Sequence, residues 1–197
     1  MVAEPKREAE PLAPGSVTGD DLRVVSRQLG RVPRPMSAVA ARCPHGFPAV
    51  VEVLPVDERG RPFPTLYYLT CPTAVAAIGA LESAGGVERF QRTVDADDGL
   101  HATLAEAVSE TRTRREELVR ALGSEDPALR LSTTGAASLA TGIGGVADPS
   151  RLKCLHAHAA HALARPAYRV GAQIVAAAGE LWCDDRRCAA FVPGEAG

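Results

Sequence analysis

The sequence predicts an α+β fold in which a small antiparallel β meander packs against a helical bundle. Between residues 37 and 70, three short stretches rich in β-branched and aromatic residues alternate with turn-forming residues. After residue 72, apolar residues recur at helical spacing, and glycine or proline separates the segments. Strands that precede a run of helices in this way are typical of α+β proteins.

The chain is expected to form one domain between two tails. Its 197 residues, of which 46% are hydrophobic, are enough for one substantial core, and we place the domain at residues 19–183. Residues 1–18 are rich in proline, glutamate and alanine without periodicity, so we predict a disordered N-terminal tail. Residues 184–197 are predicted to form a C-terminal tail.

Charge and apolar patterning argue against several classes of function. A net charge of -2 with scattered Lys and Arg gives no surface for nucleic acid. The charged N-terminus does not resemble a secretory signal, and the longest apolar stretch, residues 172–182, is too short for membrane insertion. We therefore expect a cytoplasmic protein, in which five cysteines are more often thiols or metal ligands than disulfides.

The first helix is predicted over residues 20–30, with Asp20 or Asp21 as its N-cap and Gly30 at its end. Strands are predicted at residues 37–41, 49–54 and 65–70, with a turn at 57–60. In a meander, the third strand returns to the end at which the second began. The Cys43-Pro-His-Gly46 turn and the Thr70-Cys-Pro72 corner are therefore expected at the same end of the sheet.

Further helices are predicted over residues 72–84, 87–94, 100–122 and 168–181. The helix at 100–122 carries a narrow apolar stripe. Its charged middle, residues 110–117, is predicted to be a solvated face with ion pairs. Residues 123–147, rich in glycine and other small residues, are predicted to form a connecting loop.

Residues 148–165 are the centre of the sequence, because one cysteine and three histidines lie within eight residues there. Asp148 fits an N-cap and a proline follows it, so we predict a helix over the whole segment. At about 100° per residue, the helix places three side chains within about 60° of one another. These are Cys154, His158 and His161, whereas His156 falls on the apolar face.

A glycine-rich stretch, Thr141-Gly-Ile-Gly-Gly145, precedes the central segment. Backbone N–H groups of such a loop can bind an anion, and Arg151 and Lys153 would add positive charge. Neither the P-loop lysine spacing nor the dinucleotide-binding glycine pattern is present. We therefore interpret this stretch first as a flexible connector, with anion binding as the alternative.

Four residues can converge on one end of the predicted sheet as metal ligands: Cys43, His45, Cys71 and Cys154. Cysteine and histidine are the ligands that zinc prefers in structural sites. We therefore expect a zinc site with a mainly structural role, which could also support a surface for a protein partner. The alternative is that these are ordinary buried cysteines without chemistry.

An enzyme is the alternative function. The cysteines could hold an iron–sulfur cluster, or Cys154 could be a nucleophile activated by His156, His158 or His161. No aspartate or asparagine that would orient the base is identifiable, and no protease or phosphatase signature surrounds Cys154. Cys183 and Cys188 are weaker ligand candidates, and the sequence assigns them no role.

Several motifs between Asp21 and Leu163 form a specific combination. They are Arg27-Gln-Leu-Gly-Arg31, Arg42-Cys-Pro-x-Gly46, Pro62-Phe-Pro-Thr-x-Tyr-Tyr-Leu-Thr-Cys-Pro72, Arg151-x-Lys-Cys-Leu-His156 and Ala160-His-Ala-Leu163. Together they resemble the actinobacterial family called domain of unknown function 501. The family has no established activity, so the resemblance implies a fold and a residue pattern but no reaction.

The resemblance bears on the choice of metal and of ligands. In the family, the first corner often reads Cys-Pro-Cys-Gly, and His45 stands at the position of the second cysteine. A zinc site accepts such an exchange more readily than an iron–sulfur cluster does. The resemblance also implies that His156 and His161, rather than His158, accompany Cys154 as alternative ligands or as hydrogen-bond partners of the ligands.

Overall fold

The computed structural model describes residues 16–57, 61–122 and 137–192. Parts of four predicted segments lie outside these described residues. They are residues 1–15 of the N-terminal tail, residues 58–60 of the turn, residues 123–136 of the loop, and residues 193–197 of the C-terminal tail.

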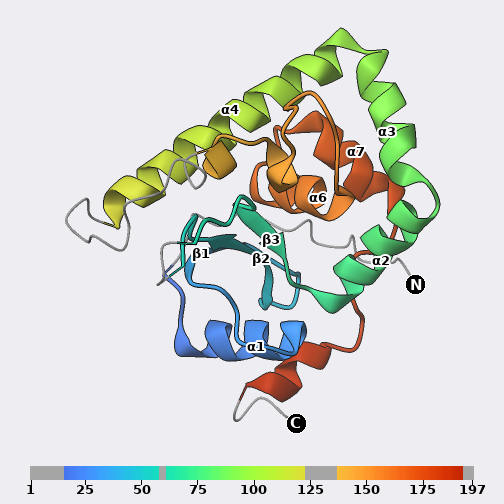
Figure 1. Ribbon diagram of the computed structural model, residues 1–197. Helices are drawn as coiled ribbons and strands as arrows, with labels where there is room; N and C mark the ends of the chain where they lie inside the picture. Colours follow the sequence, from blue (N-terminus) through green and yellow to red (C-terminus); the bar gives the residue numbers. More distant parts are fainter. Residues whose placement is uncertain (1–15, 58–60, 123–136, 193–197) are drawn as a thin grey trace, which may run out of the picture.

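The sheet is the predicted antiparallel meander, with strand order β1-β2-β3. β1 (Met36–Arg42) pairs with β2 (Pro48–Val53), which pairs with β3 (Tyr67–Leu69). Every residue of β2 is buried, because β2 is the central strand and helices cover both faces. Figure 1 shows α1 (Gly19–Leu29) on one face and α6 (Leu155–Ala164) on the other. The α+β fold class is therefore confirmed.

Alternation along β2 explains the two layers. Successive side chains of a strand point to opposite faces. Val51 packs with Val25 of α1, whereas Val50 belongs to the large cluster that contains α6. The sheet thus joins a thin layer, made with α1, to the thick helical layer on its other face.

The N-cap of α1 differs from the prediction. Thr18 is the N-cap, and Asp21 is the third helical residue of a capping box. The Thr18 hydroxyl accepts a hydrogen bond from the Asp21 N–H, and the Thr18 N–H donates to Asp21 Oδ2. Such reciprocal bonds satisfy two backbone donors at once, which explains why threonine rather than either aspartate begins the helix. Gly30 ends α1 with φ 64, as predicted.

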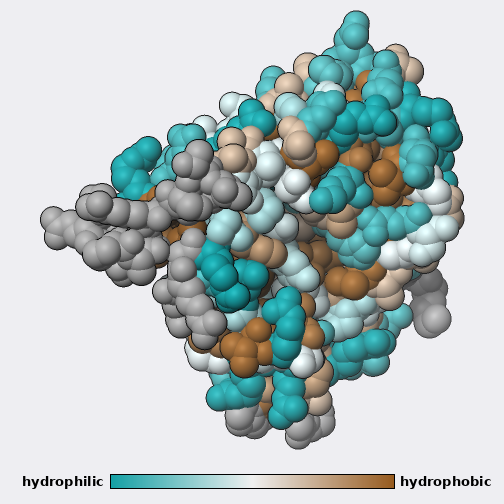
Figure 2. All heavy atoms as spheres, in the orientation of Figure 1, coloured by the Kyte–Doolittle hydropathy of each residue, from teal (hydrophilic) through white to brown (hydrophobic). Residues whose placement is uncertain are grey.

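The predicted helices after the sheet are present as α2 (Pro72–Ser83), α3 (Gly86–Asp95), α4 (Asp98–Ala121) and α7 (Arg169–Ala177). Figure 1 shows α3 and α4 meeting at an angle around α6 and α7. In Figure 2, hydrophilic residues follow the outer edges of α3 and α4, and hydrophobic residues appear in the angle between them. Among the described residues, no helix is both long enough and apolar enough to cross a membrane.

α6 is the centre of the core. Most of its residues are buried, and several are alanines that allow neighbouring elements to approach closely. The closest approach is at Gly171 of α7, where an added Cβ would lie 2.4 Å from the His158 carbonyl oxygen. The core is therefore built from close backbone packing as well as from large side chains.

The central helix begins later than predicted. Residues 148–154 form turns and an extended stretch, and α6 starts at Leu155 with Cys154 as its N-cap. The Asp148 carboxylate accepts hydrogen bonds from the Ser150 N–H and hydroxyl, which closes a turn instead of a helix. Neighbouring helices satisfy the freed backbone donors: Gln91 accepts from the Leu152 N–H and Glu82 from the Leu155 N–H.

The middle of α4 is less solvated than predicted. Thr111 and Arg115 are buried, with Arg115 only 1% exposed. The Arg115 guanidinium donates hydrogen bonds to the carbonyls of Leu139, Thr141, Gly142 and Pro64. Arg114, by contrast, forms the expected type of ion pair, here with the buried carboxylate of Glu52 at 2.9 Å. The charged run therefore contains one buried structural arginine.

Part of the C-terminal region packs on the domain. The 3-10 helix η3 (Arg187–Phe191) lies beside α1, as Figure 1 shows. Cys188 is buried in a small cluster with Val24 of α1 and Phe47. Residues 187–191, which the sequence places in a tail, thus cover one end of the molecule.

Candidate metal centre

Three side chains that can bind a metal meet where α6 crosses α2: Glu82, Cys154 and His156. One ligand atom from each lies within 4.8 Å of the other two. Cys154 Sγ is 3.9 Å from His156 Nδ1, and His156 Nδ1 is 3.0 Å from Glu82 Oε2. Within the described part of the chain, this is the one such group of Cys, His, Asp or Glu.

Local structure holds each of the three side chains. Cys154 is extended, with φ -145 and ψ 115, so its side chain leaves the chain before the helix begins. His156 lies in the first turn of α6, and its Nε2 is 3.1 Å from the Val75 carbonyl oxygen. Since a carbonyl only accepts, Nε2 carries a hydrogen and donates it. Nδ1 is thereby directed toward Cys154 and Glu82.

Glu82 is fixed by the same helix crossing. Its Oε1 accepts a hydrogen bond from the Leu155 N–H, and its Oε2 faces the imidazole. The Leu155 N–H is a free donor at the start of α6, so the carboxylate caps this helix from a neighbouring element. One carboxylate oxygen therefore remains available for a cation.

The electrostatics of the group favour a positive charge at His156. The pKa of His156 is raised to about 9, first by its hydrogen bond with the Cys154 sulfur and further by the Val75 carbonyl and Glu82. The side chains of His156 and Glu82 are 27% and 26% exposed, so solvent screens them only in part. The same neighbouring groups would stabilise either a proton or a metal ion bound at Nδ1.

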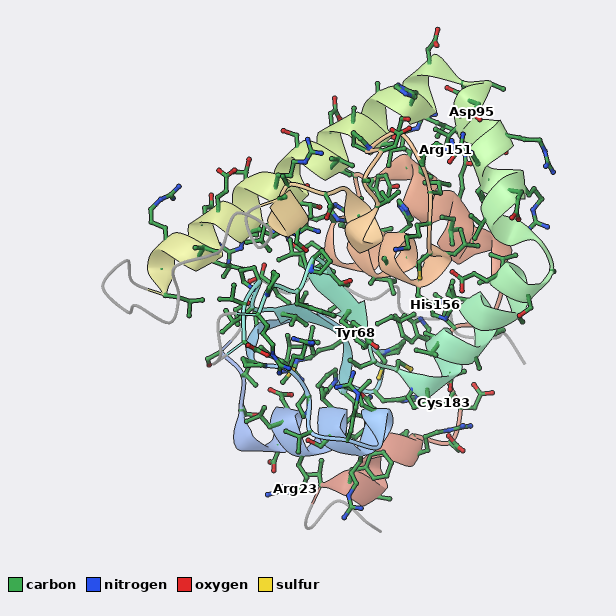
Figure 3. The ribbon with its side chains drawn as sticks, viewed as in Figure 1. Arg23, Tyr68, Asp95, Arg151, His156 and Cys183 are labelled. Carbon is green, nitrogen blue, oxygen red and sulfur yellow. The ribbon has the colours of Figure 1, made fainter. Side chains whose placement is uncertain are left out.

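A cavity of about 360 Å³ adjoins the group. Cys154 and His156 line it on one side, and Tyr67, Tyr68 and Val75 contribute to its walls. Figure 3 labels Tyr68 on β3 and His156 at the start of α6, on the elements that border this space. A small molecule in the cavity would therefore meet the thiol and the imidazole directly.

The four ligands predicted from the sequence fall into two places. Cys43 follows β1 and Cys71 is the N-cap of α2, so both lie at the same end of the sheet, as expected. Cys154 does not join them, because α6 crosses α2 beyond Cys71, at Val75 and Glu82. His45 points its Nε2 at the Cys183 carbonyl oxygen, 2.6 Å away.

The remaining histidines of α6 are buried. His158 is fully buried and its Nδ1 is 2.6 Å from the Tyr168 hydroxyl, while burial lowers its pKa to about 3. His161 is 2% exposed and packs edge-on between the rings of Tyr67 and Tyr168. His158 is thus a neutral core residue, and His161 has aromatic neighbours instead of the Cys154 thiol.

The residues suggested for anion binding lie at the surface. Arg151 Nη1 is 3.7 Å from Asp95 Oδ2, and Lys153 is exposed. Figure 3 labels Arg151 and Asp95 near α3. The nearby loop directs the carbonyls of Thr141 and Gly142 at Arg115. Anion binding by Arg151 and Lys153 stays a prediction.

Sequence reasoning missed Glu82. A single glutamate near the end of a helix is common, and nothing in its neighbourhood marks it as a ligand. Its position beside Cys154 and His156 arises from the crossing of α2 and α6, which are separated by some seventy residues of sequence. The resemblance to a family indicates His156, whereas the helical projection favours His158 and His161.

The fold and this group of residues define an α+β protein with a Cys/His/Glu group beside a cavity. The family described as "Protein of unknown function (DUF501)" matches residues 39–176, more than half of the chain, and the protein belongs to it. Neither a curated protein nor a solved structure matches the chain. The matched range contains Glu82, Cys154 and His156, whereas Cys183 and Cys188 lie beyond it.

Proposed function

We propose that this protein binds one zinc ion through Cys154 Sγ, His156 Nδ1 and Glu82 Oε2, with a further coordination position directed at the cavity. The main support is the approach of these three ligand atoms to within 4.8 Å of one another. Thiolate, imidazole and carboxylate are all zinc ligands, and sites with three protein ligands keep a position open for water or substrate.

The surroundings of the ligands support the proposal. Metal-binding histidines usually donate their second N–H to a carbonyl or carboxylate, and His156 does so to Val75. The Glu82 carboxylate is likewise held by the Leu155 N–H. These contacts orient the ligands without using the atoms that would bind the metal.

A zinc ion held by Glu82, Cys154 and His156 could also take part in a reaction. A bound zinc would supply a Lewis acid that lowers the pKa of water or polarises a carbonyl. The tyrosine-lined cavity would admit a small, partly apolar molecule to that position and limit the access of bulk water. An iron–sulfur cluster fits this group less well. The group contains one thiol, whereas such clusters are held mainly by several cysteine thiolates.

Elemental analysis of protein purified without chelator tests the proposal. Cys154→Ser and Glu82→Gln should each lower the zinc content by about one ion per chain, because serine and glutamine are much poorer zinc ligands. Glu88→Gln, an exposed residue of α3, is the matched control and should leave the zinc content unchanged. Wild-type zinc content in folded Cys154→Ser and Glu82→Gln would refute the assignment.

A thiol enzyme is the second candidate. Its support is the 3.9 Å separation of Cys154 Sγ and His156 Nδ1, with the other ring nitrogen oriented by a carbonyl. Rapid alkylation of Cys154 at pH 5 to 6 in metal-free protein, abolished by His156→Gln, would favour this function. Slow alkylation of Cys154 in both the wild-type protein and His156→Gln would exclude a thiol enzyme.

A further inference from the structure

Four cysteines gather near the end of the sheet at which β1 ends and α2 begins. Cys43 follows β1, Cys71 begins α2, and Cys183 and Cys188 come from the C-terminal segment after α7. All four are free thiols, and Cys71 and Cys188 are buried. Three parts of the chain that are far apart in sequence therefore bring thiols to one region.

Cys43 contacts both hydrophobic clusters that contain a buried cysteine. Cys43 packs against the main core cluster, which contains Cys71, and against the small cluster that contains Cys188. The electrostatics agree with this arrangement. The pKa of Cys71 is raised first by burial and additionally by Cys43 and Cys188. That of Cys188 is also raised first by burial, with Cys43 and Cys183 contributing.

Groups that favour a thiolate lie near these sulfur atoms. Cys71 is the N-cap of α2, where the backbone N–H groups of Ala74 and Thr73 act to lower the pKa of its thiol, against the larger effect of burial. The Cys188 sulfur accepts from Gln28 Nε2 at 3.5 Å. Arg187 lies beside the Cys183 sulfur and would offset negative charge there. Charged thiolates are stabilised by such donors and cations.

Local hydrogen bonds hold Cys43 and Cys183 close to each other. The Cys43 turn closes through a hydrogen bond from the Gly46 N–H to the Cys43 carbonyl at 2.9 Å, with φ 86 at Gly46. Within the same turn, His45 donates through Nε2 to the Cys183 carbonyl at 2.6 Å. His45 thereby anchors the C-terminal segment beside Cys43. Figure 3 shows Cys183 on this segment, below α2.

We propose that Cys43, Cys71, Cys183 and Cys188 form a second zinc site, which pins the C-terminal segment to the end of the sheet and to α1. Four thiols would lose their protons on binding, and the metal would adopt the closed tetrahedral coordination of structural zinc sites. No three of these sulfurs lie within 4.8 Å of one another, so metal binding requires the thiols to move closer together. His45 is a positioning residue for Cys183.

This site is independent of the proposed function. It shares no ligand with the Glu82–Cys154–His156 group, which remains one ligand short of a closed shell. The second site fills all four positions with protein thiols and leaves none for a substrate. Its expected role is therefore to stabilise the packing of η3 on α1.

Zinc counting by elemental analysis tests the second site. Wild-type protein should contain about two zinc ions per chain, and Cys183→Ala and Cys188→Ala should each contain about one. Cys154→Ser is the matched control, because it removes a thiol from the other group. Combined with Cys188→Ala, it should reduce the zinc content to nearly none. Folded Cys183→Ala and Cys188→Ala with wild-type zinc would overturn the second site and leave the first intact.

Amide hydrogen exchange of the full-length protein is a second test of this site. In Cys154→Ser protein, removal of zinc by chelator should speed amide hydrogen exchange of residues 183–192 about tenfold or more, while exchange in α4 stays constant. Unchanged exchange would overturn the proposal. An intact mass two hydrogens lower, which reveals a disulfide, or the visible absorption of an iron–sulfur cluster would also overturn a zinc site at these thiols.

Discussion

Glu110 shows how single residues stabilise the surface of the core. Its Oε1 accepts a hydrogen bond from Arg165 Nε at 2.6 Å, and its Oε2 lies 3.7 Å from Nε2 of the buried His161. The pKa of Glu110 is lowered to about 2, first by His161 and also by Arg165, against a partial desolvation. The longer distance exceeds that of a hydrogen bond, so Arg165 is the firmer partner.

Replacement of Glu110 should make stability depend less on pH. The lowered pKa means that the folded state favours the carboxylate, which stabilises the protein above about pH 4.5 and is lost as pH falls toward 2. Because Glu110 is 47% exposed, Glu110→Gln should cost only about 0.5 to 1 kcal/mol at pH 6. Urea denaturation at pH 6, 4 and 3 should show this difference shrinking. Glu106→Gln, exposed one turn earlier, is the control, and a pH-independent loss would contradict the argument.

At the scale of elements, α6 and α7 pack as closely as backbones allow. A Cβ at Gly171 would lie 2.4 Å from the His158 carbonyl oxygen, 2.6 Å from Ala162 Cβ and 2.7 Å from Tyr168 Cδ1. The first of these neighbours is backbone, so it cannot rotate away. Glycine is therefore required inside α7 although it is a poor helix former.

Gly171→Ala should destabilise the protein although alanine favours a helix. Overpacking costs about 1 to 3 kcal/mol, which exceeds the gain in helix propensity of about 1 kcal/mol at most positions. In a domain of this size, we expect differential scanning calorimetry to show a melting temperature lower by about 2 to 4 °C for each kcal/mol of net loss. The control is Gly19→Ala in α1, where an added Cβ has nothing within 4 Å. Equal melting temperatures for the two variants would show that α7 can shift freely.

At the scale of the whole molecule, Arg115 joins elements that are distant in sequence. From α4 it reaches the carbonyls of Leu139, Thr141 and Gly142 before η2 (Ile143–Gly145), and of Pro64 before β3. Burial lowers its pKa to about 10, so the guanidinium remains charged near neutral pH. The segment it holds continues to Gly144, which lines the cavity beside Cys154.

Arg115→Met should therefore weaken both stability and the shape of the cavity. Methionine fills similar space but leaves the carbonyls without a donor, which should cost about 3 to 5 kcal/mol. Urea denaturation should reveal the loss, and Arg120→Met, exposed near the end of α4, should change stability by less than about 0.5 kcal/mol. A small loss for Arg115→Met would mean that water replaces the guanidinium.

Local patterns explain which parts of the fold could be predicted. The β-rich stretches between residues 37 and 70, Gly30 at the end of α1 and the apolar stripe of α4 all act over a few residues, and the elements predicted from them agree with the structure. The start of α6 could not be predicted in this way. Asp148 has the local chemistry of an N-cap, but Gln91 and Glu82, from α3 and α2, satisfy the backbone at Leu152 and Leu155.

The sequence by itself determined the meander, the order of the helices and the meeting of Cys43 and Cys71 at one sheet end, because these follow from short-range periodicity and strand direction. Only the tertiary structure decided which groups surround Cys154 and which surround Cys188. Glu82 reaches Cys154 through the crossing of α2 and α6, and Cys188 reaches the sheet end through η3. Such contacts depend on how faces of distant elements pack, and no local pattern encodes that pairing.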